Sequence, residues 1–153
     1  MPEQRTETDQ ASVRACLLRG FLVWLLIALA ETVHGTLRTL LLKPIVGDLA
    51  SRQIGVVTGS IMILLIACAA TGWIGAKATR TLLAVGIVWF ALMLCFEVVV
   101  GRAFGLSWQR IISDYLPWQG GFMIVGMTIL ALSPLIAVRL RSGLQNSGLF
   151  ENL

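Results

Sequence analysis

The amino-acid sequence predicts an all-α integral membrane protein, built as a bundle of four transmembrane helices. The composition points to this class, because 57% of the 153 residues are hydrophobic, only 13% are charged, and the mean hydropathy is +0.84. A water-soluble domain of this length has too small an interior to bury so many apolar side chains. The chain also contains four apolar stretches of about 20 residues, the length of helix that crosses a hydrocarbon core about 30 Å thick.

The net charge of +4 arises from Lys and Arg residues that lie mostly at the ends of the apolar stretches. In a soluble chain, this charge and the isoelectric point near 9.5 would favour nucleic-acid binding. At the ends of membrane spans, the same residues orient the helices instead. We therefore expect the lipid bilayer as the environment of the chain and no nucleic-acid partner.

Residues 1–14 form a polar segment of mixed charge without periodicity, which predicts a cytoplasmic tail without regular structure. The first span follows at about residues 17–42, and Lys43 with Pro44 is expected to end its helix. This span opens the membrane domain, which we place at residues 15–141.

A cleaved signal peptide is a competing interpretation of the start of this span. The tripeptide Ala28-Leu29-Ala30 matches the small-residue pattern that precedes signal cleavage, and it follows a short apolar run. Against cleavage, the polar segment before the apolar run is long and contains acidic residues, and apolar residues resume at Val33. We therefore favour a first span that is kept whole.

The other three spans and the polar C-terminal tail are predicted at about residues 54–74, 82–100, 122–138 and 142–153. Gly55 and Gly59 open the second span with a GxxxG pattern, whose missing side chains would let another helix approach closely. In the turn before this span, Asp48 or Ser51 is expected to cap the helix.

The longest loop, residues 101–121, contains a helical pattern between spans three and four. Pro117 ends this pattern. We expect a short amphipathic helix at the outer interface, with Trp and Tyr at headgroup level, which would cover the mouth of the bundle. Its apolar face consists of Trp108, Ile111, Ile112, Tyr115 and Leu116, and its polar face of Arg110, Ser113 and Asp114.

An even number of spans puts both termini on one side of the membrane. Seven Lys and Arg residues fall on that side and four on the other, so the positive-inside rule predicts cytoplasmic termini. The seven are Arg5, Arg14, Arg19, Lys77, Arg80, Arg139 and Arg141, and the four are Lys43, Arg52, Arg102 and Arg110.

Glu31, His34 and Arg38 are three and four residues apart, so a helix places them on one face within an arc of about 60°. An ionisable residue inside a membrane helix costs about 2.5–3.5 kcal/mol on insertion scales, and such residues mark functional sites. At about 1.5 Å per residue, Arg38 lies about 6 Å from the outer end of the span and Glu31 about 16 Å. Glu97 on the third span lies near the outer end too. We expect these four residues to form a polar cluster in the outward half.

This cluster predicts binding or passage of a small polar solute, an ion or a proton, with protonation of Glu31 and His34 setting occupancy. One alternative is an accessory subunit of a membrane complex, whose buried charges pair with another protein. Another is a lipid-modifying enzyme, in which Arg38, Arg52 or Arg102 would hold an anionic headgroup. A purely structural ion-pair cluster between helices one and three is also open. The chain shows no nucleophile motif, so we expect no catalytic residues.

A metal site is a weaker hypothesis for the same residues. The Glu-x-x-His spacing of Glu31 and His34 resembles half of a carboxylate metal site in a helix bundle. Glu97 would add a third ligand, or a symmetric dimer would double the set. Because the chain has a single histidine, we expect no cofactor. A chain this small encloses little space alone, so we expect a homo-oligomer or a partner in a membrane complex.

The run from Glu31 to Arg38 (ETVHGTLR) and the segment from Pro44 to Gly55 resemble a group of small, uncharacterised bacterial membrane proteins. The likeness covers most of the chain, up to Arg141. It implies a multi-pass protein of the bacterial inner membrane and supplies no activity. The four-span size is also similar to that of small multidrug resistance transporters, which use a glutamate in their first helix. His34, Arg38 and the longer outer loop depart from that pattern, which makes drug export a poor fit.

Overall fold

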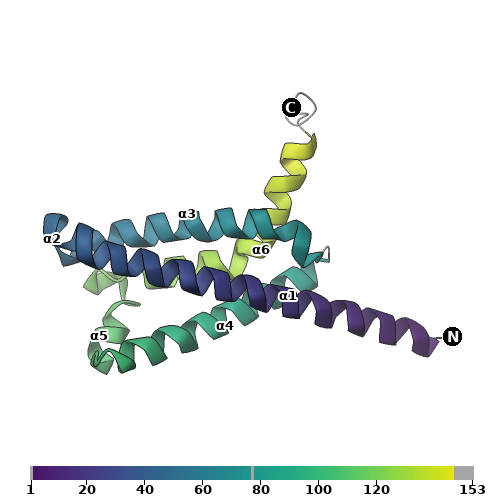
Figure 1. Ribbon diagram of the computed structural model, residues 1–153, viewed down its shortest axis with the longest axis horizontal. Coiled ribbons are helices and arrows are strands. Elements are labelled where there is room, and N and C mark those ends of the chain that lie inside the picture. The colour runs from purple at the N-terminus through teal and green to yellow at the C-terminus, as the bar shows by residue number, and fades with distance from the viewer. Residues whose placement is uncertain (1, 77, 147–153) are drawn as a thin grey trace.

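The computed structural model describes residues 2–76 and 78–146, and this part of the chain is helical throughout, with short turns and no β-strand (Figure 1). Four helical segments are long and apolar enough to cross a membrane. They are Arg14–Val46, Asp48–Ile74, Thr79–Ala103 and Met123–Gly143. The predicted all-α fold with four membrane-spanning helices is confirmed.

The four long helices pack as one bundle (Figure 1). Helix α6 (Met123–Asn146) makes the most extensive contacts, and these are with α3 (Asp48–Ile74) and α4 (Thr79–Ala103). Helix α1 (Pro2–Leu37) lies against both α3 and α4. The N-terminal part of α1 extends beyond the bundle at the end where α3 leads into α4.

The N-terminal segment differs from its prediction. Helix α1 begins at Pro2, so residues 2–14, which we expected to lack regular structure, are helical. Proline is well tolerated in the first turn of a helix, where its missing N–H has no partner to lose. Acidic residues early in a helix also interact favourably with the macrodipole. The apolar span therefore propagates its helix through a polar segment that periodicity alone does not identify as helical.

The end of the first span was also predicted wrongly. The chain does not leave the helix at Lys43 and Pro44, but passes through a π-helical turn, η1 (Arg38–Leu42), into α2 (Lys43–Val46). Proline lacks the N–H that an interior helical residue donates, and the wider π turn before it rearranges the bonds at this point. The helix ends at Gly47, whose φ of 83° is a left-handed conformation that glycine adopts freely.

Helix α3 begins at Asp48, earlier than the predicted Ile54, and the predicted cap is wrong. Gly47 occupies the N-cap position, and no side chain caps the helix. Asp48 is instead the first helical residue and forms ion pairs, while the Ser51 hydroxyl donates to the Asp48 carbonyl at 2.9 Å. A short polar stretch is thereby added to the apolar span.

The predicted short helix between spans three and four is present, although it is only one and a half turns long. It is α5 (Trp108–Ser113), and a 3₁₀ turn, η2 (Pro117–Gln119), follows it. The Ser107 side chain accepts a hydrogen bond from the Arg110 backbone N–H at 3.2 Å and so caps α5. Ile111 is buried against the bundle, which holds the segment over its end.

Helix α6 changes direction part way along, as expected for a helix with a proline in its interior (Figure 1). Pro134 has no N–H to donate to the Leu130 carbonyl, and the Ser133 hydroxyl donates to this carbonyl at 2.8 Å instead. The helix continues to Asn146, past the predicted end of the span at residue 138. The rest of the predicted C-terminal tail, residues 147–153, lies outside the described residues.

The bundle has two halves with different interiors. We name residues 14–30, 61–93 and 127–143 the closed half, and residues 31–60 and 94–126 the open half. Among the side chains that the structure describes, every buried apolar one except Ile111 lies in the closed half. There Trp89 is fully buried, and its Nε1 donates to the Gly20 carbonyl at 2.8 Å, which joins α4 to α1. The hydrophobic core therefore occupies only one end of the membrane domain.

Candidate functional site

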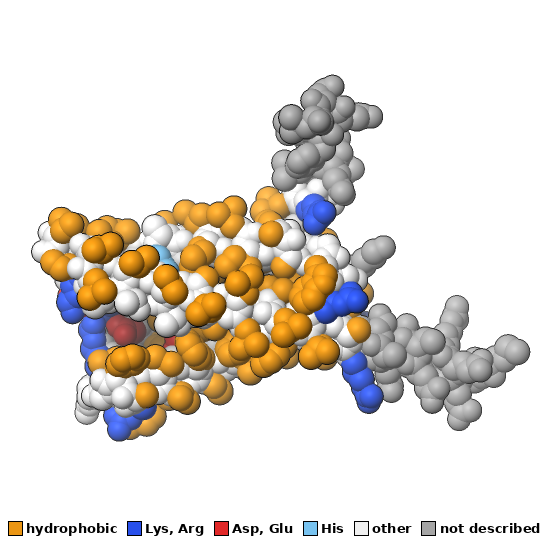
Figure 2. Space-filling model, viewed as in Figure 1, with side chains coloured by type: hydrophobic (Ala, Val, Ile, Leu, Met, Phe, Trp, Pro, Cys, Tyr) orange, Lys and Arg blue, Asp and Glu red, His pale blue; other side chains and the backbone are white. Residues whose placement is uncertain are grey.

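The open half encloses a cavity of about 650 Å³ that residues from all four long helices and from α5 line. Figure 2 shows it as a hollow between α1 and α4, with acidic side chains inside and basic side chains nearby, close to the end that carries α2 and α5. Five of the six predicted binding residues line this cavity, namely Glu31, His34, Arg38, Arg52 and Glu97. The structure therefore brings these five residues together around one cavity.

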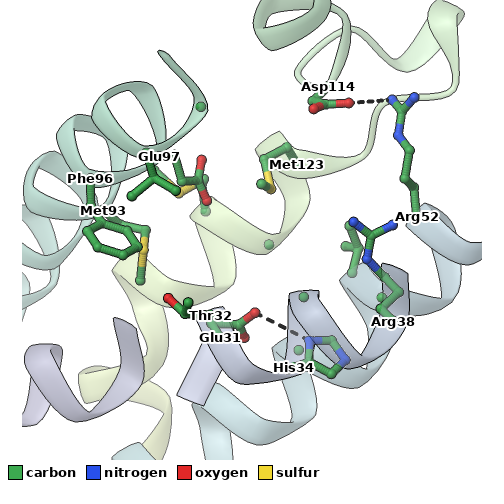
Figure 3. A pocket seen from close by; sticks show the side chains of 18 of the residues that line it. Glu31, Thr32, His34, Arg38, Arg52, Met93, Phe96, Glu97, Asp114 and Met123 are labelled. Carbon is green, nitrogen blue, oxygen red and sulfur yellow. Dashed lines mark ion pairs between the residues drawn. The ribbon is translucent and has the colours of Figure 1, made fainter. Parts of the chain in front are cut away.

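Glu31 and His34 form the polar wall on α1 (Figure 3). His34 Nδ1 lies 3.5 Å from Glu31 Oε2, and His34 Nε2 lies 2.8 Å from the Thr58 hydroxyl on α3. Each side chain is about three-quarters buried, with 26% of Glu31 and 24% of His34 exposed. The carboxyl and the imidazole are thus in contact in the membrane-spanning part, where a single proton changes the charge of the pair by one.

Two glycines of α3 make room for side chains of α1. A Cβ atom on Gly59 would lie 2.8 Å from Glu31 Oε1, and one on Gly55 would lie 2.5 Å from Arg38 Cδ. The GxxxG pattern was expected to let another helix backbone approach closely. In the structure it accommodates a carboxylate and a guanidinium stem instead, so these glycines belong to the site.

Arg38 lies in the π-helical turn η1, which directly follows α1 and continues its wall of the cavity. Its Nη1 donates a long hydrogen bond of 3.4 Å to the buried Ser51 hydroxyl. Among the side chains of residues 14–76 and 78–143, no carboxylate oxygen lies within 4.0 Å of its guanidinium. Arg38 therefore brings a positive charge to the cavity that no acidic group of the described chain neutralises by contact.

Glu97 approaches the cavity from the opposite side, on α4 (Figure 3). Its carboxylate accepts a hydrogen bond from the hydroxyl of Tyr115, which follows α5. Burial, and then the negative charge of Glu97, raises the pKa of the Tyr115 phenol well above its usual value of 10. Tyr115 is therefore a neutral donor at physiological pH, and it connects the α5 segment to the α4 wall.

A network of ion pairs holds α5 to the start of α3. Asp48 Oδ2 lies 3.1 Å from Arg110 Nη2, and Asp48 Oδ1 lies 2.9 Å from Lys43 Nζ. Arg52 Nη2 lies 2.7 Å from Asp114 Oδ1, as Figure 3 marks, and Arg52 also approaches Asp48 at 3.6 Å. The two arginines that line the cavity here, Arg52 and Arg110, are thus both matched by acids.

Sequence reasoning missed Arg110, Asp114 and Tyr115 as parts of this site. The helical pattern assigned Arg110 and Asp114 to the polar face of an interfacial helix. In the structure this face meets α3, and Asp114 and Tyr115 line the cavity. Periodicity separates the two faces of a helix but does not say what each face contacts.

Arg102 is the one predicted binding residue that does not line the cavity. Its Nη1 donates to the Leu106 carbonyl at 2.8 Å, and its guanidinium lies 5.1 Å from the centre of the Trp108 ring. Both contacts are to the connection between α4 and α5 and to α5 itself. Arg102 therefore stabilises the loop and lies outside the cavity.

The candidate metal ligands Glu31, His34 and Glu97 are not assembled as a metal site. Within the described residues, no group of three or more His, Cys, Asp or Glu side chains is placed to hold a metal ion. Glu31 contacts His34, while Glu97 contacts Tyr115 from the other side of the cavity. Glu31 and His34 thus form a pair without a third ligand among the described residues, and the hypothesis of a doubled set in a dimer stays a prediction.

The chain matches no known protein family, and comparisons with curated proteins and with solved structures find no similar protein. The resemblance to small bacterial membrane proteins therefore stays a prediction. The functional conclusion depends on the cavity and its contacts.

Proposed function

We propose that the protein binds a small solute in the cavity of the open half, and that protonation of Glu31 and His34 sets its occupancy. The observation that carries this proposal is the position of Glu31, Arg38 and Glu97 around about 650 Å³ of space within membrane-spanning helices. Cavities of roughly 300–1,000 Å³ with a few convergent polar groups are typical ligand sites.

A purely structural role for the charges fits the contacts less well. In a structural ion-pair cluster, Glu31 on α1 and Glu97 on α4 would both form ion pairs with Arg38. Arg38 instead contacts Ser51, and Glu97 contacts Tyr115. Glu31 Oε1 is shielded from solvent and has no hydrogen-bond partner among the described residues. An unpaired polar atom in such a place costs about 1–3 kcal/mol, which supports a functional reason for its retention.

Native mass spectrometry of the protein, released from its membranes in a mild detergent, tests the binding role. We expect a bound small molecule on the wild-type chain that is lost in Arg38→Gln and retained in Arg102→Gln. Arg102 is the matched control, because it is an arginine of the open half outside the cavity. A wild-type chain without any ligand, but with a stoichiometric protein partner, would instead favour an accessory subunit.

Passage across the membrane has its own test. Liposomes that contain the protein and an internal pH-sensitive dye report proton flux after a pH jump. A passage role predicts flux in the wild type and in Arg102→Gln, and its loss in Glu31→Gln, which keeps the side-chain shape but cannot ionise. Equal flux in Glu31→Gln would remove Glu31 from the proton path.

We further propose a bacterial inner membrane, with both termini in the cytoplasm and the open half facing outward. The excess of Lys and Arg on the side of the termini supports this orientation. Alkaline phosphatase is active only outside the cytoplasm, so a fusion at residue 105 should be active and one at residue 146 inactive. The opposite pattern would invert the orientation.

A further inference from the structure

The deep wall of the cavity is apolar, because the cavity borders the core of the closed half there. Ile63 on α3, Met93 and Phe96 on α4, and Met127 and Leu130 on α6 line it. The polar lining lies mainly on α1 and beneath α5. A volume of about 650 Å³ is far larger than an ion or a proton requires. The shape and lining therefore fit a ligand with a polar group at one end and a substantial apolar part.

The cavity opens sideways between two membrane helices. In the closed half α1 and α4 are in contact, as the bond between Trp89 and the Gly20 carbonyl shows. In the open half a hollow separates them (Figure 2). Apolar side chains cover the surface on both sides of the hollow in this view, and exposed apolar residues of the two helices include Val33 and Leu37 on α1 and Val99 on α4. Such surfaces face acyl chains, so the opening lies where a molecule dissolved in the bilayer can enter.

Charge complementarity selects the polar end of the ligand. Of the three arginines that line the cavity, Arg52 and Arg110 are paired with Asp114 and Asp48, whereas the Arg38 guanidinium forms no ion pair with the described side chains and donates to the Ser51 hydroxyl. A guanidinium binds carboxylate and phosphate oxygens by charge-assisted hydrogen bonds. Glu31 lies almost two turns deeper on α1, and in its ionised form it disfavours an anion beyond Arg38. An anionic group would therefore stop at Arg38.

On the basis of the proposed binding function, we infer that the ligand is an anionic single-chain amphiphile, a long-chain carboxylate or phosphate monoester. It enters from the bilayer between α1 and α4. Its anionic group binds Arg38, and its chain lies against the apolar wall formed by α3, α4 and α6.

Photolabelling in phosphatidylcholine vesicles that contain the purified full-length protein tests this inference. The probes are a fatty acid with a diazirine in its chain and the matching fatty alcohol. We expect the acid to label peptides that contain Met93 and Met127, and the alcohol to label them at least about tenfold less, since a hydrogen bond to a charged group contributes about 1.5–3 kcal/mol. Equal labelling by the alcohol would overturn the role of the anionic group.

Variants assign the anionic contact to one residue. Labelling by the acid should fall about tenfold in Arg38→Gln, and Arg38→Lys, which keeps the positive charge, should restore part of it. Arg102→Gln should label like the wild type. Circular dichroism and size-exclusion profiles establish that each variant is folded. Full labelling of a folded Arg38→Gln variant would overturn the assignment.

Competition separates this inference from the proposed function. Dodecanoate and dodecyl phosphate should displace the probe, whereas acetate and inorganic phosphate should not. Displacement of the probe by acetate or inorganic phosphate alone would indicate a site for small polar solutes. It would overturn the inference that the ligand is an amphiphile. A wild-type protein that no probe labels, and that carries no ligand in native mass spectra, would overturn both proposals.

Discussion

The closed and open halves consist of the same four helices, yet they bury opposite kinds of residue. In the closed half the interior contains large apolar side chains, with Trp89 and Leu130 almost completely shielded. In the open half the buried positions on α3 are Ser51, Gly55 and Ser60, together with Gly59. The first arrangement fills the space between the helices, and the second leaves room for polar side chains. Packing is therefore concentrated at one end of the bundle, and the cavity occupies the other.

The glycines of the two halves lie against different groups. For this reason we expect the closed half to be more rigid than the open half. In the closed half, Gly86 lets the backbone of α6 approach α4, because a Cβ atom there would lie 1.8 Å from the Ala131 carbonyl oxygen. In the open half, Gly59 is close only to the flexible end of the Glu31 side chain. A backbone cannot move aside without separating two helices, whereas a carboxylate can change its rotamer.

The largest effect should follow from Gly86→Ala. The added methyl group has no space against the Ala131 carbonyl, so α4 and α6 must separate, and we expect a loss of more than about 3 kcal/mol of stability. Thermal unfolding in detergent, followed by circular dichroism, measures it. Gly35→Ala is the control, because a Cβ atom there meets no atom within 4 Å. A Gly86→Ala variant as stable as Gly35→Ala would show that the closed half is not tightly packed.

Gly59→Ala should have a smaller effect on stability and a clear effect on binding. The methyl group displaces the Glu31 carboxylate, which can rotate away, so we expect a loss of about 1 kcal/mol or less of stability. The shifted carboxylate alters the cavity, and retention of the native ligand in mass spectra should fall. Gly143→Ala on α6 is the control, since a Cβ atom there meets no described atom within 4 Å and Gly143 does not line the cavity. Unchanged ligand retention in Gly59→Ala would separate Glu31 from the binding site.

Hydropathy was sufficient to predict the four spans, because each crosses the bilayer as an apolar stretch of adequate length. It could not predict where the helices end. Helix α3 begins at Asp48 because ion pairs with Lys43 and Arg110 stabilise a charged first turn. The π turn at Arg38–Leu42 is equally invisible, since it arises from the local bonding around Pro44.

The helical spacing of Glu31, His34 and Arg38 predicted that they share one face of a helix, because residues three and four apart lie on the same side, and in the structure all three line the cavity. The other walls depend on contacts between distant segments. Nothing in the sequence indicates that Asp114 meets Arg52 or that Tyr115 meets Glu97. The small residues of α3 indicate space for polar side chains only when the residues of α1 that face them are known.

The smallest effect is confined to alkaline pH, and it tests how tightly α5 closes the open half. Tyr115 is the single tyrosine of the chain, so tyrosinate absorbance reports on this residue alone. Its pKa is raised in the folded protein, first by burial and then by the charge of Glu97, whereas an unfolded phenol ionises near pH 10. The folded state therefore holds the proton more tightly. Stability should be unaffected by this group below about pH 10 and should fall as the pH rises further.

We expect tyrosinate to appear at higher pH in the folded than in the denatured protein, and the alkaline loss of stability to be smaller in Tyr115→Phe. Ionisation of the folded protein near pH 10 would mean that water reaches Tyr115, and that α5 leaves the open half accessible from its end as well as from its side.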